Sequence, residues 1–470
     1  MFETIIDTIN TFLYSKLLIV ILIGSGIYFT IRTRFPQVRL FRKACNAVME
    51  KPEGKESVSS FQALMVSTAS RVGTGNIVGV SSAICIGGVG SVFWMWIIAI
   101  LGSASALAES TLAQIYKKKG EDGKCYGGPA YYIEAALHSR GLAVVFCIAM
   151  ILTYAFGFNM LASYNLQSTF AGQPFYNAEI TPWIIGGILS LVMGWCLLGG
   201  GNRIVKVTST LVPFMGIAYI LVSLLVVVLN IGQLPSVMAQ IFKEAFDFKA
   251  IFAGFAGSAM MQGIRRGLYS NEAGIGSAPN AAASAVVSHP VKQGLVQMLS
   301  VFIDTLLLCT ATAMMCLVSG VIPAKELQGA PWVQAALHKT LGSFGPYFIM
   351  IAMVLFAFTT LLGNCFYCDN LLTYIHKKQP DRKFMTGFRI VSALAVFWGA
   401  GMEMTLLWHI SDVLMGVMAL INIPVILILS NTVVKTLKDY EIQIQQKKNP
   451  VFFSKNIDLK QKTDYWNEKN

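Results

Sequence analysis

The stretch "STASRVGTGNIVGV", Ser67–Val80, places one arginine and three glycines between two apolar runs. If these runs lie in a lipid bilayer, every unpaired backbone amide or carbonyl between them costs several kcal/mol. Irregular backbone at that depth is tolerated only where it lines a polar site or is buried in protein. Glycine is a poor helix former, and threonine and asparagine are modest ones. We therefore expect the helix to unwind within residues 72–76.

The composition of the whole chain indicates an integral membrane protein. Of the 470 residues, 55% are hydrophobic and only 13% are charged, which is too little charge to cover a soluble domain of this size. A transmembrane helix needs about 20 mostly apolar residues. The sequence predicts an all-α protein with eleven spans, near 15–33, 61–83, 89–116, 141–163, 181–198, 206–230, 250–269, 294–319, 344–374, 385–402 and 405–434.

The placement of basic residues predicts the orientation of the chain. The formal net charge is +12, and the basic residues cluster after the first, third, fifth, seventh, ninth and eleventh spans, as in Lys117–Lys119. Cytoplasmic loops carry such an excess. We expect a multi-pass protein of the cell membrane, with the N-terminus outside and the C-terminus in the cytoplasm. This pattern accounts for the charge without a nucleic-acid partner.

The spans divide the chain into three parts. Residues 1–60 hold one transmembrane helix and a basic cytoplasmic loop, residues 61–434 form the core, and the polar tail 435–470 is expected to be a mobile cytoplasmic extension. The core divides into two sets of five spans, 61–230 and 250–434. Because five is odd, the second set is inverted relative to the first. "CYGGPAYYIEAAL", Cys125–Leu137, is too short to span and predicts an amphipathic interfacial helix.

Each set of five opens with a glycine-rich helix, the second containing "FAGFAGSAM", Phe252–Met260. Interrupted helices at matching positions of inverted halves indicate the binding site of a secondary transporter. Unwinding at the first break frees carbonyls for sodium and amides for a substrate carboxylate, and the following half-helix directs its positive end at that anion. Close packing of small residues is the alternative. At the first break the adjacent Thr-Gly-Asn and Arg71 favour a binding site, whereas at the second the two interpretations are balanced.

A threonine pair, Thr359 and Thr360, lies in the middle of the ninth span. Two hydroxyl groups with neighbouring carbonyls suit a hard, weakly held cation such as sodium. The alternative is that each hydroxyl bonds to a carbonyl of its own helix.

Four segments resemble the alanine or glycine:cation symporter family, the sodium:alanine symporters. They are "STASRVGTGNIVGV", "GGVGSVFWMWIIAILG" (Gly87–Gly102), "CYGGPAYYIE" and "RRGLYSNEAGIGSAPNAAASA", and the likeness extends from about residue 60 to 430. That family is similar to the leucine-transporter fold. The resemblance implies a five-plus-five inverted repeat whose discontinuous first and sixth core helices surround an amino acid and sodium.

The resemblance also implies roles for single residues. The substrate carboxylate would bind the amides of Thr74 and Gly75 beside Asn76, and Phe255 and Ser258 would flank the substrate. One sodium would lie between the carbonyls of Ala69 and Val72 and the residues Phe356, Thr359 and Thr360 of the eighth core helix.

The resemblance leaves Arg71 unexplained, although a buried guanidinium is costly and is usually functional. It can replace a second cation, or complete a polar pocket with Gln262 for a larger substrate such as glutamine. Alternatively it forms a salt bridge with Glu109 or Asp304, which we favour slightly. "SNEAG", Ser270–Gly274, is expected to belong to a gate, with Glu272 capping a helix or paired with Arg265 or Arg266.

Together these features predict sodium-coupled symport of a small neutral amino acid, alanine or glycine, by alternating access. The coupling ion is the only cofactor expected, and no obligate protein partner is evident. Alternatives are a larger neutral amino acid such as glutamine or serine, and protons in place of sodium. The spans carry too few ionisable residues for a channel pore, and the sequence contains neither a P-loop nor a catalytic motif. A channel, a membrane enzyme or a primary pump is therefore disfavoured.

Overall fold

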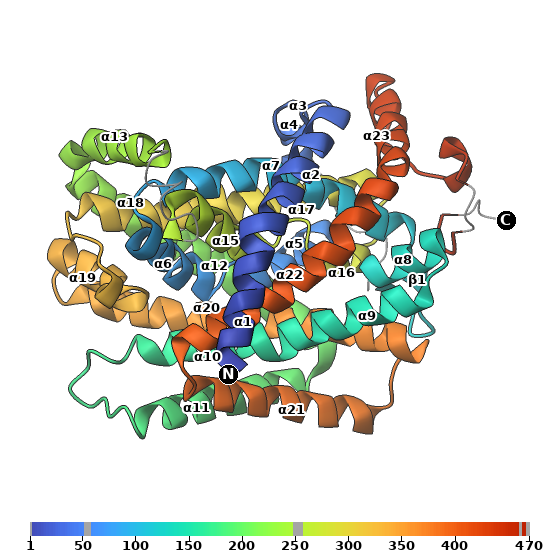
Figure 1. Ribbon diagram of the computed structural model, residues 1–470. Helices are drawn as coiled ribbons and strands as arrows, with labels where there is room; N and C mark the ends of the chain where they lie inside the picture. The colour runs from blue at the N-terminus through green and yellow to red at the C-terminus, as the bar shows by residue number, and fades with distance from the viewer. Residues whose placement is uncertain (1, 51–57, 248–256, 460–462, 467–470) are drawn as a thin grey trace.

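The computed structural model describes residues 2–50, 58–247, 257–459 and 463–466. In these ranges the chain is almost entirely helical, with one small antiparallel pair of strands, β1 (Lys118–Lys119) and β2 (Cys125–Tyr126). Figure 1 shows a bundle with α13 and α19 at one end and α8 and β1 at the opposite end.

The first part of the chain forms a long helical rod and the first half of the bundle. Its elements are α1 (Phe2–Phe12), a π-helical turn (Leu13–Leu18), α2 (Ile19–Arg32), α3 (Pro36–Arg39), α4 (Phe41–Val48), α5 (Ser60–Arg71), α6 (Val78–Gly87), α7 (Ser91–Ile115), α8 (Pro129–Leu137), α9 (Arg140–Ile151), a second π-helical turn (Leu152–Gly157), α10 (Phe158–Ser168), α11 (Thr181–Leu197), α12 (Gly200–Leu229) and α13 (Leu234–Ala245). The expected interfacial helix is α8, with Pro129 in its first turn.

The second part completes the bundle. Its elements are α15 (Ala259–Asn271), α16 (Pro279–Ser284), α17 (Pro290–Val301), a π-helical stretch (Phe302–Cys309), α18 (Thr310–Val318), α19 (Ala330–Leu341), α20 (Phe344–His376), α21 (Arg382–Ala400), α22 (Met404–Ile428) and α23 (Ser430–Gln445). Short 3-10 turns cover Thr74–Asn76, Ile231–Gln233, Lys325–Leu327 and Ser454–Ile457.

The hydropathy of the helices fits a membrane protein. Within the described residues six helices are long and apolar enough to cross a membrane: Ser91–Ile115, Arg140–Ser168, Gly200–Leu229, Pro290–Val318, Phe344–His376 and Met404–Ile428. Three further apolar helices have 10–17 residues and lie within predicted spans: Ile19–Arg32, Thr74–Gly87 and Thr181–Leu197. Large apolar side chains on α11, α12 and α21, such as Leu191, Phe214 and Trp398, are more than half exposed, which suits contact with lipid chains.

The centre of the bundle is built from short and interrupted helices. Helix α7 packs against α15 and α17, while α5 packs against α12 and α20. Gly363 on α20 permits the last of these contacts, because a Cβ there would lie 2.6 Å from the backbone nitrogen of Ser70. The structure thus brings the end of α5 directly against the middle of α20.

The close contact at Gly363 should make the stability of the protein sensitive to a larger residue at this position. Gly363→Ala should lower the melting temperature in detergent, because the added methyl group meets backbone rather than a flexible side chain, and such overpacking costs roughly 1–3 kcal/mol. The matched control is Gly216→Ala on α12, where an added Cβ meets no atom within 4 Å. That variant should melt at the wild-type temperature or above it, because alanine favours helix. Equal melting of the two variants would contradict the packing described here.

Candidate functional site

The backbone leaves helical geometry where the glycines of the opening stretch predict it. Helix α5 ends at Arg71, Val72 has ψ 87° and Gly73 is extended at φ −143° and ψ −154°. Helix α6 resumes at Val78 after a 3-10 turn. The amide of Gly73 donates to Oδ1 of Asn76 at 2.8 Å, so a side chain replaces the hydrogen bond that the helix would have supplied.

A second interruption lies between α15 and α16, at residues 272–278. Glu272, Gly274 and Gly276 have φ of +54°, +85° and +88°, a region that favours glycine. These residues are buried, and Glu109 of α7 accepts hydrogen bonds from the amides of Gly274 and Gly276 at 3.2 and 3.1 Å. The carboxylate therefore satisfies backbone groups that the missing helical turn leaves free.

The position of this interruption differs from the predicted one at Phe252–Met260. Residues 252–256, including Phe255, lie outside the described part of the chain. Ser258 caps α15 by accepting from the amide of Met261 at 3.3 Å, and Gln262 packs beside Gly87. Because α15 has 13 residues, Ser258 lies about 20 Å along it from Glu272. The structure does not bring Ser258 or Gln262 to the other predicted site residues.

The two interruptions meet at a small buried cavity. It is lined by Ser70, Arg71, Gly73, Thr74, Gly75, Phe158, Tyr269, Glu272 and Thr360 and has a volume of about 10 Å³, which is room for about one water molecule. The rings of Phe158 and Tyr269 lie edge to face at 4.9 Å between centroids. A Cβ on Gly75 would come within 2.7 Å of the Tyr269 ring. An amino acid can enter only if these walls move apart.

Glu272 belongs to this cavity and not to an arginine pair. Its carboxylate accepts from the hydroxyls of Ser70 at 3.2 Å and Ser277 at 2.7 Å. The expectation that Glu272 pairs with Arg265 or Arg266 is wrong, because Asp412 of α22 lies 3.7 and 2.9 Å from those two guanidinium groups. The position of Glu272 past the end of α15 turns its side chain toward the first break.

Arg71 is buried beside three carboxylates without touching one. It is 2% exposed, and its Nη1 lies 3.5 and 3.4 Å from the backbone and side-chain oxygens of Gln297. No residue in the described part of the chain forms a hydrogen bond with its Nε or Nη2. The carboxyl groups of Glu109, Glu272 and Asp304 lie close enough to interact electrostatically with its charge. Among the residues that the structure describes it forms no ion pair, so the favoured salt bridge to Glu109 or Asp304 is not present.

Asn76 and Asp304 join the first break to the helix that follows α17. Nδ2 of Asn76 donates to Oδ1 of Asp304 at 2.7 Å. The other carboxylate oxygen accepts from the hydroxyls of Ser270 at 2.8 Å and Thr305 at 2.7 Å. The side chain of Asn76 is thus engaged with Gly73 and Asp304, which leaves the backbone of Thr74 and Gly75 on the cavity side.

The two threonines of α20 differ in their surroundings. The hydroxyl of Thr359 donates to the carbonyls of its own helix, at 3.0 Å to Leu355 and 3.2 Å to Phe356. The hydroxyl of Thr360 has no partner although the residue is only 6% exposed. A Cβ on Gly73 would lie 2.0 Å from it, so Thr360 faces the first break directly.

The remaining predicted sodium ligands share this neighbourhood. Ala69 and Val72 at the end of α5 are fully buried, as is Phe356 of α20, and α5 and α20 pack on each other. The structure also adds Ser70, Phe158, Tyr269 and Glu272 to the site. Glu272 had a usable signal, an acid between glycines inside an apolar chain. The two aromatic residues had none, because aromatic side chains fill every part of this core.

Comparisons with known proteins place this geometry in a family. The family model described as "Sodium:alanine symporter family" matches residues 1–454. Relatives include the amino-acid carrier protein AlsT of Bacillus subtilis (strain 168), 42% identical, covering 99% of this chain and 98% of its own length. The sodium/alanine symporter AgcS of Methanococcus maripaludis is 36% identical, with 95% and 99% covered.

Two further proteins bear on substrate and fold. The probable sodium/glutamine symporter GlnT of Bacillus subtilis (strain 168) is 43% identical, with 96% of this chain and 93% of the relative covered. Among solved structures, MhsT in complex with L-phenylalanine aligns with a TM-score of 0.56 at 12% identity, over 82% of this chain and 93% of that one. At that identity the likeness shows the fold, which is that of the leucine-transporter group.

Glu109 should contribute strongly to stability, because it accepts three buried hydrogen bonds. Glu109→Ala should lower the melting temperature strongly, because it leaves the amides of Gly274 and Gly276 and Nδ2 of Asn422 without their acceptor. Each such group costs roughly 1–3 kcal/mol. Glu109→Gln keeps the shape and one acceptor oxygen and should lose less. Thermal unfolding in detergent measures both, and wild-type melting of the alanine variant would disprove this role.

Proposed function

The chain belongs to the sodium:alanine symporter family, and we propose that it imports a small neutral amino acid, alanine or glycine, together with sodium. It is a transporter rather than an enzyme. One positive charge moving inward gains roughly 2.3 kcal/mol per 100 mV, and a tenfold sodium gradient adds about 1.4 kcal/mol. Together they drive accumulation of several hundredfold without ATP.

The observation that carries this proposal is the meeting of two helix interruptions at a buried polar cavity. Such a junction supplies both free backbone groups and helix ends for a zwitterion and a cation. The rings of Phe158 and Tyr269 keep the space narrow, and Tyr269 lies so close to Gly75 that a Cβ there would not fit; this favours a small substrate. Glutamine is the second candidate, because the relative GlnT carries that substrate in its name.

The finer architecture is part of the same proposal. Eleven spans, arranged as one N-terminal helix and a five-plus-five inverted repeat, put the N-terminus outside and the C-terminus in the cytoplasm. The basic hairpin β1–β2 and α8 lie together at one end of the bundle, opposite α13 and α19 (Figure 1). This supports an assignment of the first end to the cytoplasm, in line with the excess of basic residues there.

For binding we propose the amides of Thr74 and Gly75 for the substrate carboxylate, with Asn76 fixing the turn. For sodium we propose the carbonyls of Ala69 and Val72 with Phe356, Thr359 and Thr360. The buried, unpartnered hydroxyl of Thr360 beside Gly73 supports this assignment.

We add Arg71 and Glu272 to the substrate site. One is a base and the other an acid, and they line the same cavity and belong to the two different interruptions. Two guanidinium nitrogens of Arg71 lack partners, and the carboxylate of Glu272 is held by hydroxyls alone. An amino acid presents the complementary pair of charges. Arg71 then binds the carboxylate of the substrate, and Glu272 binds its ammonium group.

Sodium-driven uptake tests the function and the cation site. In proteoliposomes, labelled alanine should accumulate only with an inward sodium gradient and should exchange in counterflow, unlike flux through a channel. Thr359→Ala with Thr360→Ala should abolish sodium-dependent uptake. Thr360→Val alone should raise the half-saturating sodium concentration at least tenfold, and Thr359→Val should raise it less because that hydroxyl is bound within its own helix. Unaltered sodium dependence in the double variant would remove the proposed site.

Competition by substrate analogues tests Arg71 and Glu272 separately. Alaninamide lacks the carboxylate and lactate lacks the ammonium, and the wild-type protein should reject both. Arg71→Gln should narrow the preference for alanine over alaninamide, and Glu272→Gln the preference for alanine over lactate, each by about tenfold for one lost charge contact of 1.4 kcal/mol. A purely structural role would weaken all ligands together and leave both ratios unchanged.

A further inference from the structure

The polar C-terminal tail packs against the core instead of extending away from it. We call residues 449–459 and 463–466 the strap. Phe452 and Trp466 of the strap are only 1% and 5% exposed, and their rings lie 5.4 Å apart, edge to face. The sequence predicts a mobile tail because residues 435–470 are polar and lack sustained helical amphipathicity. In the structure Phe452 and Trp466 are two buried anchors that hold the strap against the core, at the end of the bundle that carries α8 and β1 (Figure 1).

The strap is hydrogen-bonded to the loop between α16 and α17. The amide of Phe452 donates to the carbonyl of Ser288 at 2.9 Å, and the hydroxyl of Ser288 donates to the carbonyl of Pro450 at 2.7 Å. The ring of His289 lies between Tyr440 and Phe452, with centroids 5.0 and 5.3 Å away. This loop directly follows α16, the short helix after the second interruption.

The strap is also fixed to the end of α7. Nε1 of Trp466 donates to the carbonyl of Gln114 at 2.7 Å. Nζ of the fully buried Lys117 lies 3.9 Å from the centre of the Tyr465 ring and donates to the carbonyl of Ala285 at 2.9 Å. A desolvated ammonium on an aromatic face is a strong form of this contact. One lysine thus joins α7, the strap and the loop after α16.

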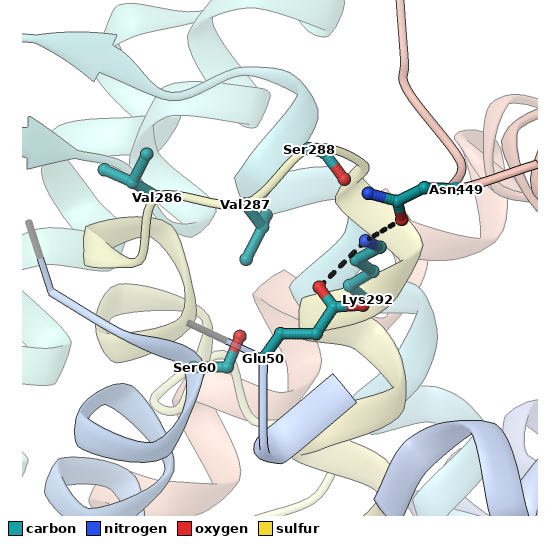
Figure 2. A pocket seen from close by; sticks show the side chains of 7 residues that line it. All are labelled: Glu50, Ser60, Val286, Val287, Ser288, Lys292 and Asn449. Carbon is teal, nitrogen blue, oxygen red and sulfur yellow. Dashed lines mark hydrogen bonds and ion pairs between the residues drawn. The ribbon is translucent and has the colours of Figure 1, made fainter. Parts of the chain in front are cut away.

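Lys292 extends this connection to the start of α5. Figure 2 shows its Nζ donating both to Glu50, at 2.8 Å, and to Asn449 of the strap, at 2.9 Å. The three bonded residues line a pocket of about 330 Å³, and Ser60, the first residue of α5, lines the same pocket. Gln293 donates to the hydroxyl of Ser60 at 2.9 Å. The ends of α5 and α16 that lie away from the cavity are therefore held at one place, beneath the strap.

We propose that the strap is a latch that keeps this end of the transporter closed and must release in each cycle for the end to open. Alternating access opens one side by moving elements around the binding site, and α5 and α16 are the short helices that adjoin the two interruptions. The strap contacts the loop after α16 directly and, through Lys292, is linked to Glu50 ahead of α5, so it stabilises the arrangement in which these segments lie together. A contact made in one state alone shifts the equilibrium toward that state.

A reversible crosslink tests the latch. Ser288→Cys with Pro450→Cys joins the strap to the loop after α16, at the position of the 2.7 Å hydrogen bond. The matched control, Gln443→Cys with Val451→Cys, joins the strap to α23 only, at a position where the two residues already exchange hydrogen bonds of 2.9 Å. Both pairs are made in a Cys45→Ser background, because the other eight cysteines are buried.

Oxidation of the first pair should reduce sodium-driven alanine uptake at least tenfold, and a reductant should restore it. The control pair should keep its uptake when oxidised. Uptake by the reduced variants reports on the proposed substrate, whereas the ratio of oxidised to reduced uptake reports on the latch alone. A complete crosslink with unchanged uptake, or an equal loss in the control pair, would overturn the proposal.

Loss of the aromatic anchors gives a second measurement that needs no crosslink. Phe452→Ala with Trp466→Ala should speed maleimide labelling of Ser60→Cys several-fold, because Ser60 is 2% exposed beneath the closed end. Phe453→Ala, at the half-buried neighbouring position, is the matched control and should leave the labelling rate unchanged. Equal rates in both variants would also count against the latch.

Discussion

The constraint on which the structure depends is that backbone groups freed from a helix inside a membrane protein must find partners. Two helices are interrupted at the centre of the bundle, and each interruption is satisfied by a buried polar side chain. Asn76 accepts the amide of Gly73, and Glu109 accepts those of Gly274 and Gly276. These partners are themselves polar or charged, so the irregular backbone and the buried charges occur together.

The buried charged groups around the cavity form one electrostatic group, distinct from the separate pair of Arg266 and Asp412. Arg71 interacts electrostatically with Glu109, Glu272 and Asp304. Amide donors bind Glu109, hydroxyl donors bind Glu272, and both kinds bind Asp304. In a medium of low dielectric constant such charges act over longer distances than in water. The cavity region therefore holds one basic and three acidic side chains. A site of this kind fits a transporter that binds a sodium ion and a zwitterion together, as the family does.

The features that depend on neighbouring residues in the chain could be predicted from the sequence. The break at residues 72–76 follows from poor helix formers placed in an apolar run, and the helices of the bundle lie close to their predicted spans. The predicted break at Phe252–Met260 lies largely outside the described residues, and the interruption at residues 272–278 was not predicted. Gly274 and Gly276 follow an acid and have positive φ, which the sequence alone does not specify. Partners far apart in the chain, such as Arg266 and Asp412, could not be predicted because nothing in either segment specifies the other.

The interrupted helices also explain how the binding cavity and the strap can communicate. Helix α5 has 12 residues and is roughly 18 Å long. Ser60 at one end lies beneath the strap, and Arg71 at the other end lines the cavity. A continuous helix would tie Arg71 to α6, but the break at Val72 and Gly73 frees α5 to tilt as a unit. Ligands that draw the cavity walls together therefore act on the same rigid element whose far end is bonded to Gln293, next to the strap-bound Lys292.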